Sequence, residues 1–319
     1  MRALVVEQEA GPEGVRLADV TAPDPAGLVV AVEAAGVGFP DLLMSQGRFQ
    51  IRQQPPFILG WEAAGTVLHA PPGSAFALGQ PVMTLSFGAH AEQVSAVPEA
   101  TWPLPPGVSF EEAAAFPLNY LTAYAALALR GRLRAGETVL VQGAAGGVGT
   151  AAIQVAKGLG ARVVGVVSTE QKAETARAAG ADEVVLTSAD WRAEVLRATD
   201  GGAHVAFDPV GGDRFATTLR CLRSQGRLVV VGFADGAIPE LAVNRLLLRN
   251  IDVCGCTWSV LAEQPDGLAH AVAHLARMIT AGHVRPVVDR VLPLEQGPSA
   301  LVSIDRREAH GKLVLRIAS

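Results

Sequence analysis

A glycine-rich segment at residues 143–149, Gly-Ala-Ala-Gly-Gly-Val-Gly, has the residue types needed to bind a phosphate group. The apolar residues before it predict a strand, and the small apolar residues after it predict a helix. Gly146 lets the backbone approach a pyrophosphate, Gly149 allows close helix–strand packing, and the helix start supplies N–H donors with a partial positive charge. Ala144 replaces the first glycine of the usual fingerprint, which otherwise predicts dinucleotide binding by Ala145, Gly146, Gly147, Val148 and Gly149.

The end of the next predicted strand, at residues 162–167, indicates which dinucleotide is bound. An NAD site places Asp or Glu there on the ribose 2′-hydroxyl, and this chain has Ser168 instead. A 2′-phosphate is then not repelled, and the Ser168 hydroxyl and the Lys172 ammonium can bind it by charge-assisted hydrogen bonds. We therefore predict NADPH as the cofactor. Glu170 weakens this preference, and a merely solvated Lys172 is the alternative.

Strands and helices alternate around this segment for more than a hundred residues. Each predicted strand is short and apolar throughout, as expected when helices cover both faces of a parallel sheet. We predict strands at 138–142, 162–167, 183–186, 205–208, 227–231 and 251–254, with helices at 147–159, 170–179 and 212–222. Six strands in this arrangement predict an α/β fold with a Rossmann doubly wound sheet.

The sequence on either side of this alternation has a different composition and a different pattern of apolar residues. Residues 1 to about 110 carry short Val-rich stretches separated by Pro and Gly pairs, which favours a β-rich unit. A second β-type segment, 284–292 with 312–317, does not extend the alternation and is expected to return to that unit. We therefore expect a Rossmann domain, 117–258, inserted into a discontinuous substrate domain, 1–116 plus 259–319.

Composition and charge exclude several other classes of protein. Half of the 319 residues are hydrophobic, so the chain is not disordered, and a net charge of −5 opposes nucleic-acid or anionic-lipid binding. The apolar run at the start is too short for a signal peptide, and no run approaches membrane-spanning length. Three cysteines do not form a disulfide framework, so we expect a cytoplasmic location.

An ordered set of motifs along nearly the whole chain resembles the medium-chain dehydrogenase/reductase superfamily, specifically its zinc-independent NADPH:quinone oxidoreductase branch. The motifs are Gly36-Val-Gly-Phe-Pro-Asp41, Gly60-Trp-Glu62-Ala-Ala-Gly65, Asn119-Tyr-Leu-Thr122-Ala-Tyr124, the glycine segment and His310-Gly-Lys-Leu-Val. The resemblance implies that the substrate domain is GroES-like. Zinc alcohol dehydrogenases of the superfamily place catalytic-metal ligands at the positions of Gly38, Trp61 and Leu118, and none of these residues binds zinc. We therefore expect no metal.

The same resemblance implies where substrate and nicotinamide bind. It puts the nicotinamide over Thr122 and near Val231, Gly232 and Phe233, and it draws the substrate pocket from Phe39, Asp41, Phe49, Trp61, Asn119 and Tyr120. Relatives commonly carry Asn at the position of Gly38 and Tyr at that of Phe49. Because both polar groups are lost here, we expect a pocket for bulky hydrophobic electrophiles. The proton donor stays open, with Tyr120 and Asn119 as candidates and a structural role for Tyr120 as the alternative.

The expected reaction is metal-independent, NADPH-dependent reduction of quinones or α,β-unsaturated carbonyls. Two alternatives are an enoyl-thioester reductase, for which Arg48 and Arg52 could contact the carrier phosphate, and an NADPH-binding sensor or structural protein without turnover. His270 with His274 and Cys254 with Cys256 lack the further ligands of a metal site. The strand near 251–256 resembles the edge strand through which the family forms homodimers, so a homodimer is expected by analogy.

Overall fold

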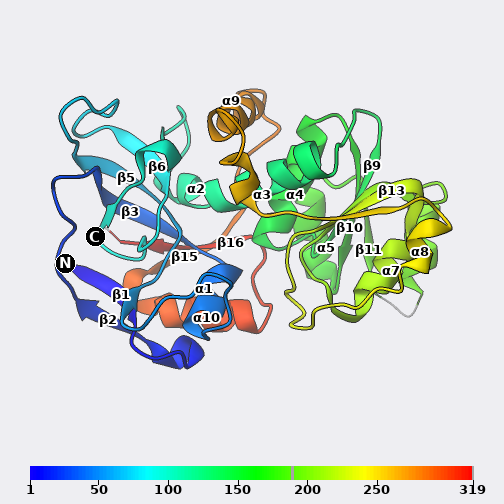
Figure 1. Ribbon diagram of the computed structural model, residues 1–319, viewed down its shortest axis with the longest axis horizontal. Coiled ribbons are helices and arrows are strands. Elements are labelled where there is room, and N and C mark those ends of the chain that lie inside the picture. Colours follow the sequence, from blue (N-terminus) through cyan, green and yellow to red (C-terminus); the bar gives the residue numbers. More distant parts are fainter. Residues whose placement is uncertain (188–189, 318–319) are drawn as a thin grey trace. The chain divides into compact units, whose positions relative to one another are not determined.

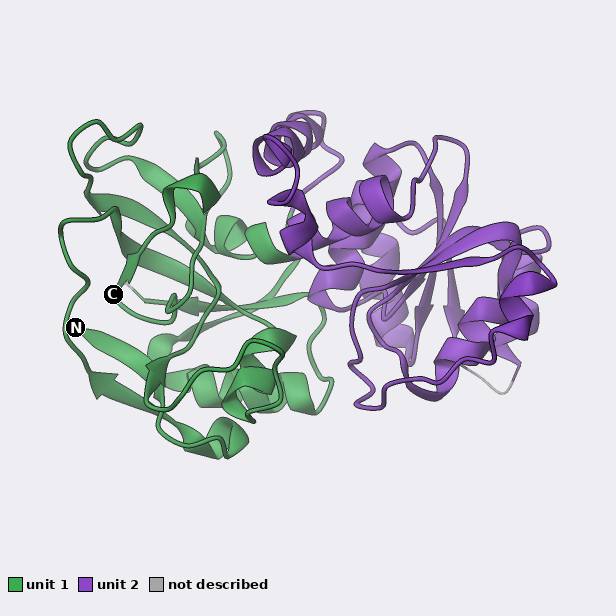
Figure 2. Cartoon of the chain, viewed as in Figure 1, with its two compact units in different colours: residues 1–118, 286–319 green, residues 119–285 purple. Residues whose placement is uncertain are grey.

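The computed structural model describes residues 1–187 and 190–317, which form two compact units (Figure 2). Unit 1 comprises Met1–Leu118 and Pro286–Ser319, and unit 2 comprises Asn119–Arg285. The chain therefore leaves unit 1, builds unit 2 and then returns. The change along the sequence, from short Val-rich stretches to alternating strands and helices and back, predicts this inserted arrangement.

Unit 2 is built on a six-stranded parallel sheet (Figure 1). Its strands are β9 (Thr138–Gln142), β10 (Arg162–Val167), β11 (Glu183–Leu186), β12 (Ala203–Asp208), β13 (Leu222–Val230) and β14 (Asp252–Gly255). They lie in the order β11-β10-β9-β12-β13-β14, so the direction of progression reverses between β9 and β12. This is the doubly wound Rossmann order, which confirms the predicted fold class, and ligands of such sheets bind at the carboxyl ends of the strands near the reversal.

Helices cover both faces of this sheet. On one face, α6 (Trp191–Ala198) and α7 (Phe215–Arg220) form a buried core with side chains of β9, β10, β12 and β13. On the other face, α4 (Gly147–Gly158) and α5 (Glu170–Ala178) pack on β9 and β10, and α3 (Pro117–Tyr124) continues as a π-helical segment, η3 (Ala125–Arg130). The strands are apolar on both sides because both sides are covered.

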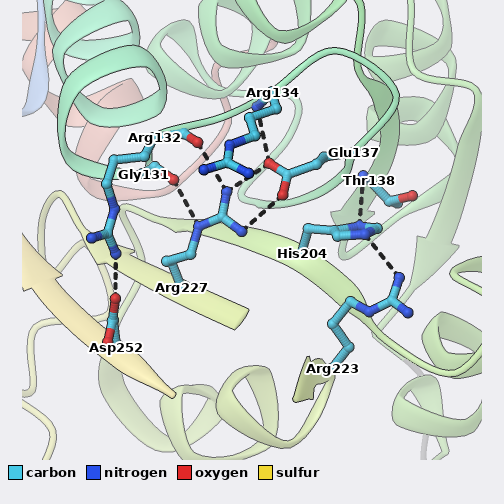
Figure 3. A network of polar contacts seen from close by, with 9 residues as sticks. All are labelled: Gly131, Arg132, Arg134, Glu137, Thr138, His204, Arg223, Arg227 and Asp252. Atoms are coloured by element: carbon cyan, nitrogen blue, oxygen red, sulfur yellow. Dashed lines mark hydrogen bonds and ion pairs between the residues drawn. The ribbon is translucent and has the colours of Figure 1, made fainter. Parts of the chain in front are cut away.

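A partly buried ion pair holds the amino-terminal edge of this sheet together (Figure 3). The Arg227 guanidinium binds Glu137 Oε2 at 2.6 Å, and it also donates to the carbonyls of Gly131 and Arg132. The two charged side chains are 12% and 16% exposed. The contacts attach the turn before β9 to β13, at the end of the sheet opposite the glycine segment.

Unit 1 is β-rich, with two sheets. One has the order β2-β1-β4, and the other has β15-β16-β3-β5-β6-β8, with β7 pairing with β3. The bounds are β1 (Arg2–Val6), β2 (Val15–Asp19), β3 (Val29–Val37), β4 (Phe57–Ile58), β5 (Glu62–His69), β6 (Pro81–Leu85), β7 (Gln93–Ser95), β8 (Thr101–Pro103), β15 (Val288–Pro293) and β16 (Lys312–Arg316). The pairing of β16 with β3 shows that the carboxyl-terminal segment returns to the amino-terminal unit, as expected.

Short helices complete unit 1. They are α1 (Phe39–Ser45), α2 (Phe110–Ala114) and α10 (Gly297–Asp305), with single turns at η1 (Gly11–Gly14), η2 (Pro98–Ala100) and η6 (Leu294–Gln296). The helical stretch is interrupted before Pro117, because α2 ends at Ala114 and Pro117 is the first residue of α3.

The second boundary between the units lies later in the chain than the sequence predicts. Residues 259–285, expected in the substrate domain, belong to unit 2. The reason is α9 (Gly267–Thr280), which packs on α4 so closely that a Cβ on Gly158 would lie 2.8 Å from Met278 Sδ. The Gln154 side chain then binds both the N–H and the carbonyl of Arg285, which fixes the end of this segment to α4. The remaining elements of unit 2 are η4 (Gly212–Arg214), α8 (Asn244–Leu247) and η5 (Trp258–Leu261).

Candidate functional site

The glycine segment connects β9 to α4 at the carboxyl end of the unit 2 sheet. Gly143 has a φ of 59°, Gly146 is the extended N-cap residue, and α4 begins at Gly147. The first bond of the helix ladder runs from Thr150 N–H to the Gly146 carbonyl, so the N–H groups of residues 147–149 have no partner within the helix. These donors and the helix dipole make this turn suitable for an anion.

Two glycines of the segment have different steric environments. A Cβ on Gly149 would lie 2.2 Å from the Gly143 carbonyl oxygen and 2.9 Å from Ala144 Cα, so the protein itself requires glycine here. A Cβ on Gly146 would meet one atom within 4 Å, the Gly143 oxygen at 3.5 Å, which is ordinary contact. Glycine at 146 is therefore not explained by packing within the chain. A dinucleotide phosphate close to this backbone would explain it.

The segment that follows β10 carries the two residues that are expected to bind a 2′-phosphate, Ser168 and Lys172. Ser168 follows the strand directly and is exposed. Thr169 caps α5 by accepting from Lys172 N–H at 3.3 Å, so α5 starts at this strand end and Lys172 stands in its first turn, half-buried. The Glu170 carboxylate binds Arg177 at 2.6 Å, which offsets its negative charge near the Ser168 hydroxyl.

The segments after β12 and β13 lie at the same end of the sheet. Asp208, the last residue of β12, accepts from the N–H groups of Val210 and Gly211, and its own carbonyl accepts from Val231 N–H. Phe233 packs on Gly211, where an added Cβ would lie 3.0 Å from its ring. Val231, Gly232 and Phe233 are half-buried. The structure thus brings 143–149, Ser168, 209–211 and 231–233 to the carboxyl ends of four adjacent strands.

The candidate residues of α3 differ in how accessible they are. Tyr120 is 2% exposed, and its hydroxyl donates to Gln154 Oε1 at 2.7 Å. Burial raises the pKa of this phenol far above its usual value. Both observations favour the structural role for Tyr120 over proton donation. Asn119 is buried at 8% exposure, and Thr122 is half-buried.

In unit 1 the structure brings two pocket candidates into contact. Trp61 stacks edge-on against Phe49 at 5.8 Å between ring centroids and against Phe87 at 5.5 Å. Phe87 in turn lies 6.1 Å from Phe57. A small hollow beside this cluster is lined by Glu9, Met44, Gly47, Phe49, Ile51, Arg52, Gln53 and Phe57. Phe57 and Phe87 could not be predicted as neighbours of Trp61 from the sequence, because only the fold brings them together.

Asp41 lies at the start of α1, beside a buried ion pair. Its Oδ2 accepts from Gly38 N–H at 2.7 Å. Lys312 Nζ pairs with Glu62 Oε1, and Glu62 Oε2 accepts from Leu118 N–H at 2.7 Å. Burial raises the pKa of the Glu62 carboxyl, and the Lys312 ammonium opposes the increase. A Cβ on Gly38 would lie 3.1 Å from Lys312 Nζ, so this ammonium stands directly beside one of the three positions that hold metal ligands in zinc relatives.

The other side chains considered for a metal or a carrier phosphate have other contacts. His274 Nδ1 lies 3.3 Å from the Tyr124 hydroxyl, and Arg52 donates to the Gly47 carbonyl. Among residues 1–187 and 190–317, no three His, Cys, Asp or Glu side chains are close enough together to hold a metal ion. Within the same ranges no helix has the length and apolarity needed to span a bilayer.

Comparison with known proteins identifies the class of this fold. Residues 24–121 match the family model described as alcohol dehydrogenase GroES-like domain, and residues 147–276 match the one described as zinc-binding dehydrogenase. The quinone oxidoreductase-like protein 2 of Bos taurus is 35% identical over 294 residues, covering 90% of this chain and 84% of that protein. The chain therefore belongs to the medium-chain dehydrogenase/reductase superfamily, and within it to the quinone oxidoreductase branch.

Solved structures give the same result at the level of the fold. A probable oxidoreductase from Mycobacterium abscessus is 43% identical, with a TM-score of 0.91 and coverage of 99% of this chain and 98% of that one. The Escherichia coli quinone oxidoreductase, solved in complex with NADPH, is 29% identical, with a TM-score of 0.91 over 99% and 100% of the two chains. The resemblance read from the sequence motifs is thereby confirmed, as is the GroES-like assignment of the β-rich unit.

Proposed function

We propose that the protein is an NADPH-dependent oxidoreductase that reduces quinones or α,β-unsaturated carbonyls without a metal ion. The observation that carries the proposal is the turn from β9 into α4. There Gly149 is required by the protein itself, whereas Gly146 leaves backbone accessible to a ligand. Relatives of the quinone oxidoreductase branch, one of them solved with NADPH, support the same cofactor and reaction class.

The chemistry fits the residues that the chain provides. Bound NADPH would supply the hydride, and quinones and enones accept hydride without the Lewis acid that alcohol oxidation needs. Gly38, Trp61 and Leu118 supply no zinc ligand at the positions that zinc relatives use. The chain would then orient the cofactor through residues 143–149 and 231–233.

Selectivity for NADPH over NADH tests the role assigned to Ser168 and Lys172. Lys172→Ala is expected to raise the Kd for NADPH about tenfold, because one charge-assisted hydrogen bond is lost, and to leave the Kd for NADH unchanged. Ser168→Asp places a carboxylate against the 2′-phosphate and should reverse the preference. Lys157→Ala is the matched control, since Lys157 pairs with Asp182 instead. Equal loss of both cofactors in Lys172→Ala would refute this role.

The substrate class is tested by the aromatic cluster of unit 1. Phe49 contacts Trp61 edge-on, and relatives commonly have Tyr at the position of Phe49. Phe49→Tyr is expected to lower kcat/KM for a naphthoquinone relative to a short enal, because a hydroxyl is added to an apolar wall. Unchanged ratios of kcat/KM would remove Phe49 from the substrate pocket.

Turnover by the chelator-treated protein separates the competing functions. Oxidation of NADPH with 9,10-phenanthrenequinone or an enone supports the proposal. NADPH binding without turnover of these acceptors favours an enoyl-thioester reductase or a sensor, and turnover with a carrier-bound enoyl thioester decides between them. Loss of turnover on chelation, restored by zinc, would contradict metal independence.

We also propose that the protein is a cytoplasmic homodimer assembled through β14. This strand is an edge of the described six-stranded sheet, so its outer hydrogen-bonding groups are available to a second copy. In the segment before β14, the side chains of Ile238, Val243, Leu247 and Leu248 are 73–80% exposed, which a partner surface would cover. Light scattering should give a dimer for the wild type, and Leu247→Asp with Leu248→Asp should dissociate it.

The cytoplasmic location is supported by the cysteines. All three are free thiols, as expected in a reducing compartment: Cys221, Cys254 and Cys256.

A further inference from the structure

Two buried oxygen atoms without a hydrogen-bond partner stand at the ends of adjacent strands. They are Gln142 Oε1, at the end of β9, and Asp208 Oδ2, at the end of β12. Gln142 is fully buried and Asp208 is 1% exposed. A buried acceptor without a donor is costly, so a pair of them requires an explanation.

The strand register places these two residues next to each other. Val139 pairs with Val205, and Val141 pairs with Phe207, so the next step along both strands pairs Gln142 with Asp208. Both side chains point to the face covered by α7, as do those of Leu140 and Ala206 two residues earlier. Neighbouring strands are about 4.8 Å apart, which two such side chains span. This pair bridges the reversal of strand order, where dinucleotides bind.

Neighbouring contacts fix which atom of Gln142 faces Asp208. The Thr218 hydroxyl donates its proton to the Arg214 carbonyl at 3.0 Å, so it can only accept from Gln142. The donor in that 3.0 Å contact is therefore Gln142 Nε2. The amide oxygen of Gln142 is left as the group available to Asp208.

The contacts of Asp208 show which of its two carboxylate oxygens has no donor. Its Oδ1 accepts from Val210 N–H at 2.9 Å and from Gly211 N–H at 3.0 Å, so Oδ2 is the oxygen left over. Two buried acceptors are then left on residues that the strand register places opposite each other. One proton placed between them satisfies both.

We propose that Asp208 is a protonated, neutral side chain in the native protein at neutral pH, and that its Oδ2–H donates to Gln142 Oε1. Asp208 is then a positioning residue that connects the two strands flanking the cofactor site. Through Gln142 it acts on the glycine segment, and through Oδ1 it holds the turn at 209–211. The effect on cofactor binding rests on the proposed function, but the protonation itself does not.

The charged groups around Asp208 are compatible with this assignment. Burial raises the pKa of its carboxyl, while the two backbone N–H groups and the Arg214 guanidinium oppose the increase. Arg214 lies in η4, and the Asp235 side chain stands next to Gly212, from the loop after β13. β9 and α7 contribute the uncharged Gln142 and Thr218 to this site.

The sign of the pH dependence of stability tests the proposal. A carboxyl whose folded-state pKa is raised binds more protons in the native state than in the unfolded state. Wild-type stability, measured relative to Asp208→Asn, should therefore fall as pH rises above 3.8, the ordinary Asp value. Asp182→Asn is the matched control with the opposite expectation. Burial alone would raise the pKa of Asp182, but hydrogen bonds from Lys157 and Val163 lower it, so wild-type stability relative to this variant should rise with pH.

An infrared measurement on the wild type does not depend on whether a variant folds. Protein labelled with carbon-13 aspartate should show the C=O band of a buried protonated carboxylic acid at pH 7, and Gln142→Met should shift that band to the frequency of an acid without a hydrogen-bond acceptor. Absence of an acid band, or a rise of wild-type stability with pH relative to Asp208→Asn, overturns the proposal.

Cofactor binding is the separate readout of the positioning role. With NADPH, Asp208→Asn should bind within about threefold of wild type, because its amide can replace the O–H donor, whereas Gln142→Met should bind at least tenfold more weakly. Equal binding by Gln142→Met and wild type overturns the positioning role. If no protein binds NADPH while the acid band and the pH slope are as expected, the proposed function fails and the protonation of Asp208 holds.

Discussion

Substitution of the two glycines at the start of α4 separates the demands of the fold from those of the cofactor. In Gly149→Ala, the new methyl group would lie 2.2 Å from the Gly143 oxygen, against about 3.4 Å for ordinary contact, so the backbone must move by about 1 Å. In Gly146→Ala, the nearest atom is at 3.5 Å and no movement is needed. The first change should therefore damage the protein, and the second should damage binding alone.

The size of each effect follows from these contacts. In Gly149→Ala, overpacking of this kind should lower the free energy of unfolding by about 3 kcal/mol. This is more than the ~1 kcal/mol by which alanine stabilises a helix relative to glycine. The net loss of about 2 kcal/mol corresponds, for a unit of this size, to a fall in Tm of about 6 °C. Gly146→Ala should keep the wild-type Tm and raise the Kd for NADPH at least tenfold, since its methyl group would occupy the space of the pyrophosphate.

Thermal unfolding and NADPH titration by fluorescence measure the two effects on the same samples. The reasoning about Gly149 is wrong if Gly149→Ala unfolds within 2 °C of wild type, a margin of about 1 kcal/mol or less. The reasoning about Gly146 is wrong if Gly146→Ala binds NADPH as wild type does. Loss of stability in both variants would mean that the two glycines serve the fold alike.

Two ion pairs, one partly buried and one fully buried, give further tests. Arg227→Ala should lower the free energy of unfolding by about 2 kcal/mol because it leaves the partly buried Glu137 unpaired, whereas Arg132→Ala, at an exposed pair, should cost about 0.5 kcal/mol or less. Burial alone would raise the pKa of the Glu137 carboxyl, but hydrogen bonds from Arg227 and a backbone N–H lower it. Denaturant titrations should therefore show that the loss of stability in Arg227→Ala becomes smaller below pH 4.5. A loss of stability that does not depend on pH would argue against the ion pair. Lys312→Met should lower the free energy of unfolding by about 3 kcal/mol because it leaves the buried Glu62 carboxylate without a partner, and adding Glu62→Gln should restore much of that loss. Purely additive losses in the double variant would contradict the coupling of these two side chains.

The unit 2 sheet could be predicted from sequence because its signals are local. The strands β9, β10 and β11 have the predicted bounds, since each apolar run ends at a glycine, a hydroxyl residue or a charge. β13 begins at Leu222, five residues earlier than predicted, because Leu222 pairs with Ala203 before an irregularity at 223–226, where Gln225 has a φ of 61°. The helices α6 and α10 were not predicted, and neither were β1 and β2. These short elements form because the fold gives them a partner surface.

The substrate side could be predicted less well because its contacts join residues that are distant in the chain. Trp61 contacts Phe49 before it and Phe87 after it, and neither spacing has a periodicity that marks a common site. Tyr120 illustrates the reverse problem. Its residue type and its place in a family motif suggest proton donation, but burial and the bond to Gln154 give its hydroxyl a structural partner. A phosphate-binding turn is defined by backbone, which a short stretch of glycines encodes directly. A substrate pocket is defined by side chains, and their roles depend on which surfaces the whole fold brings together.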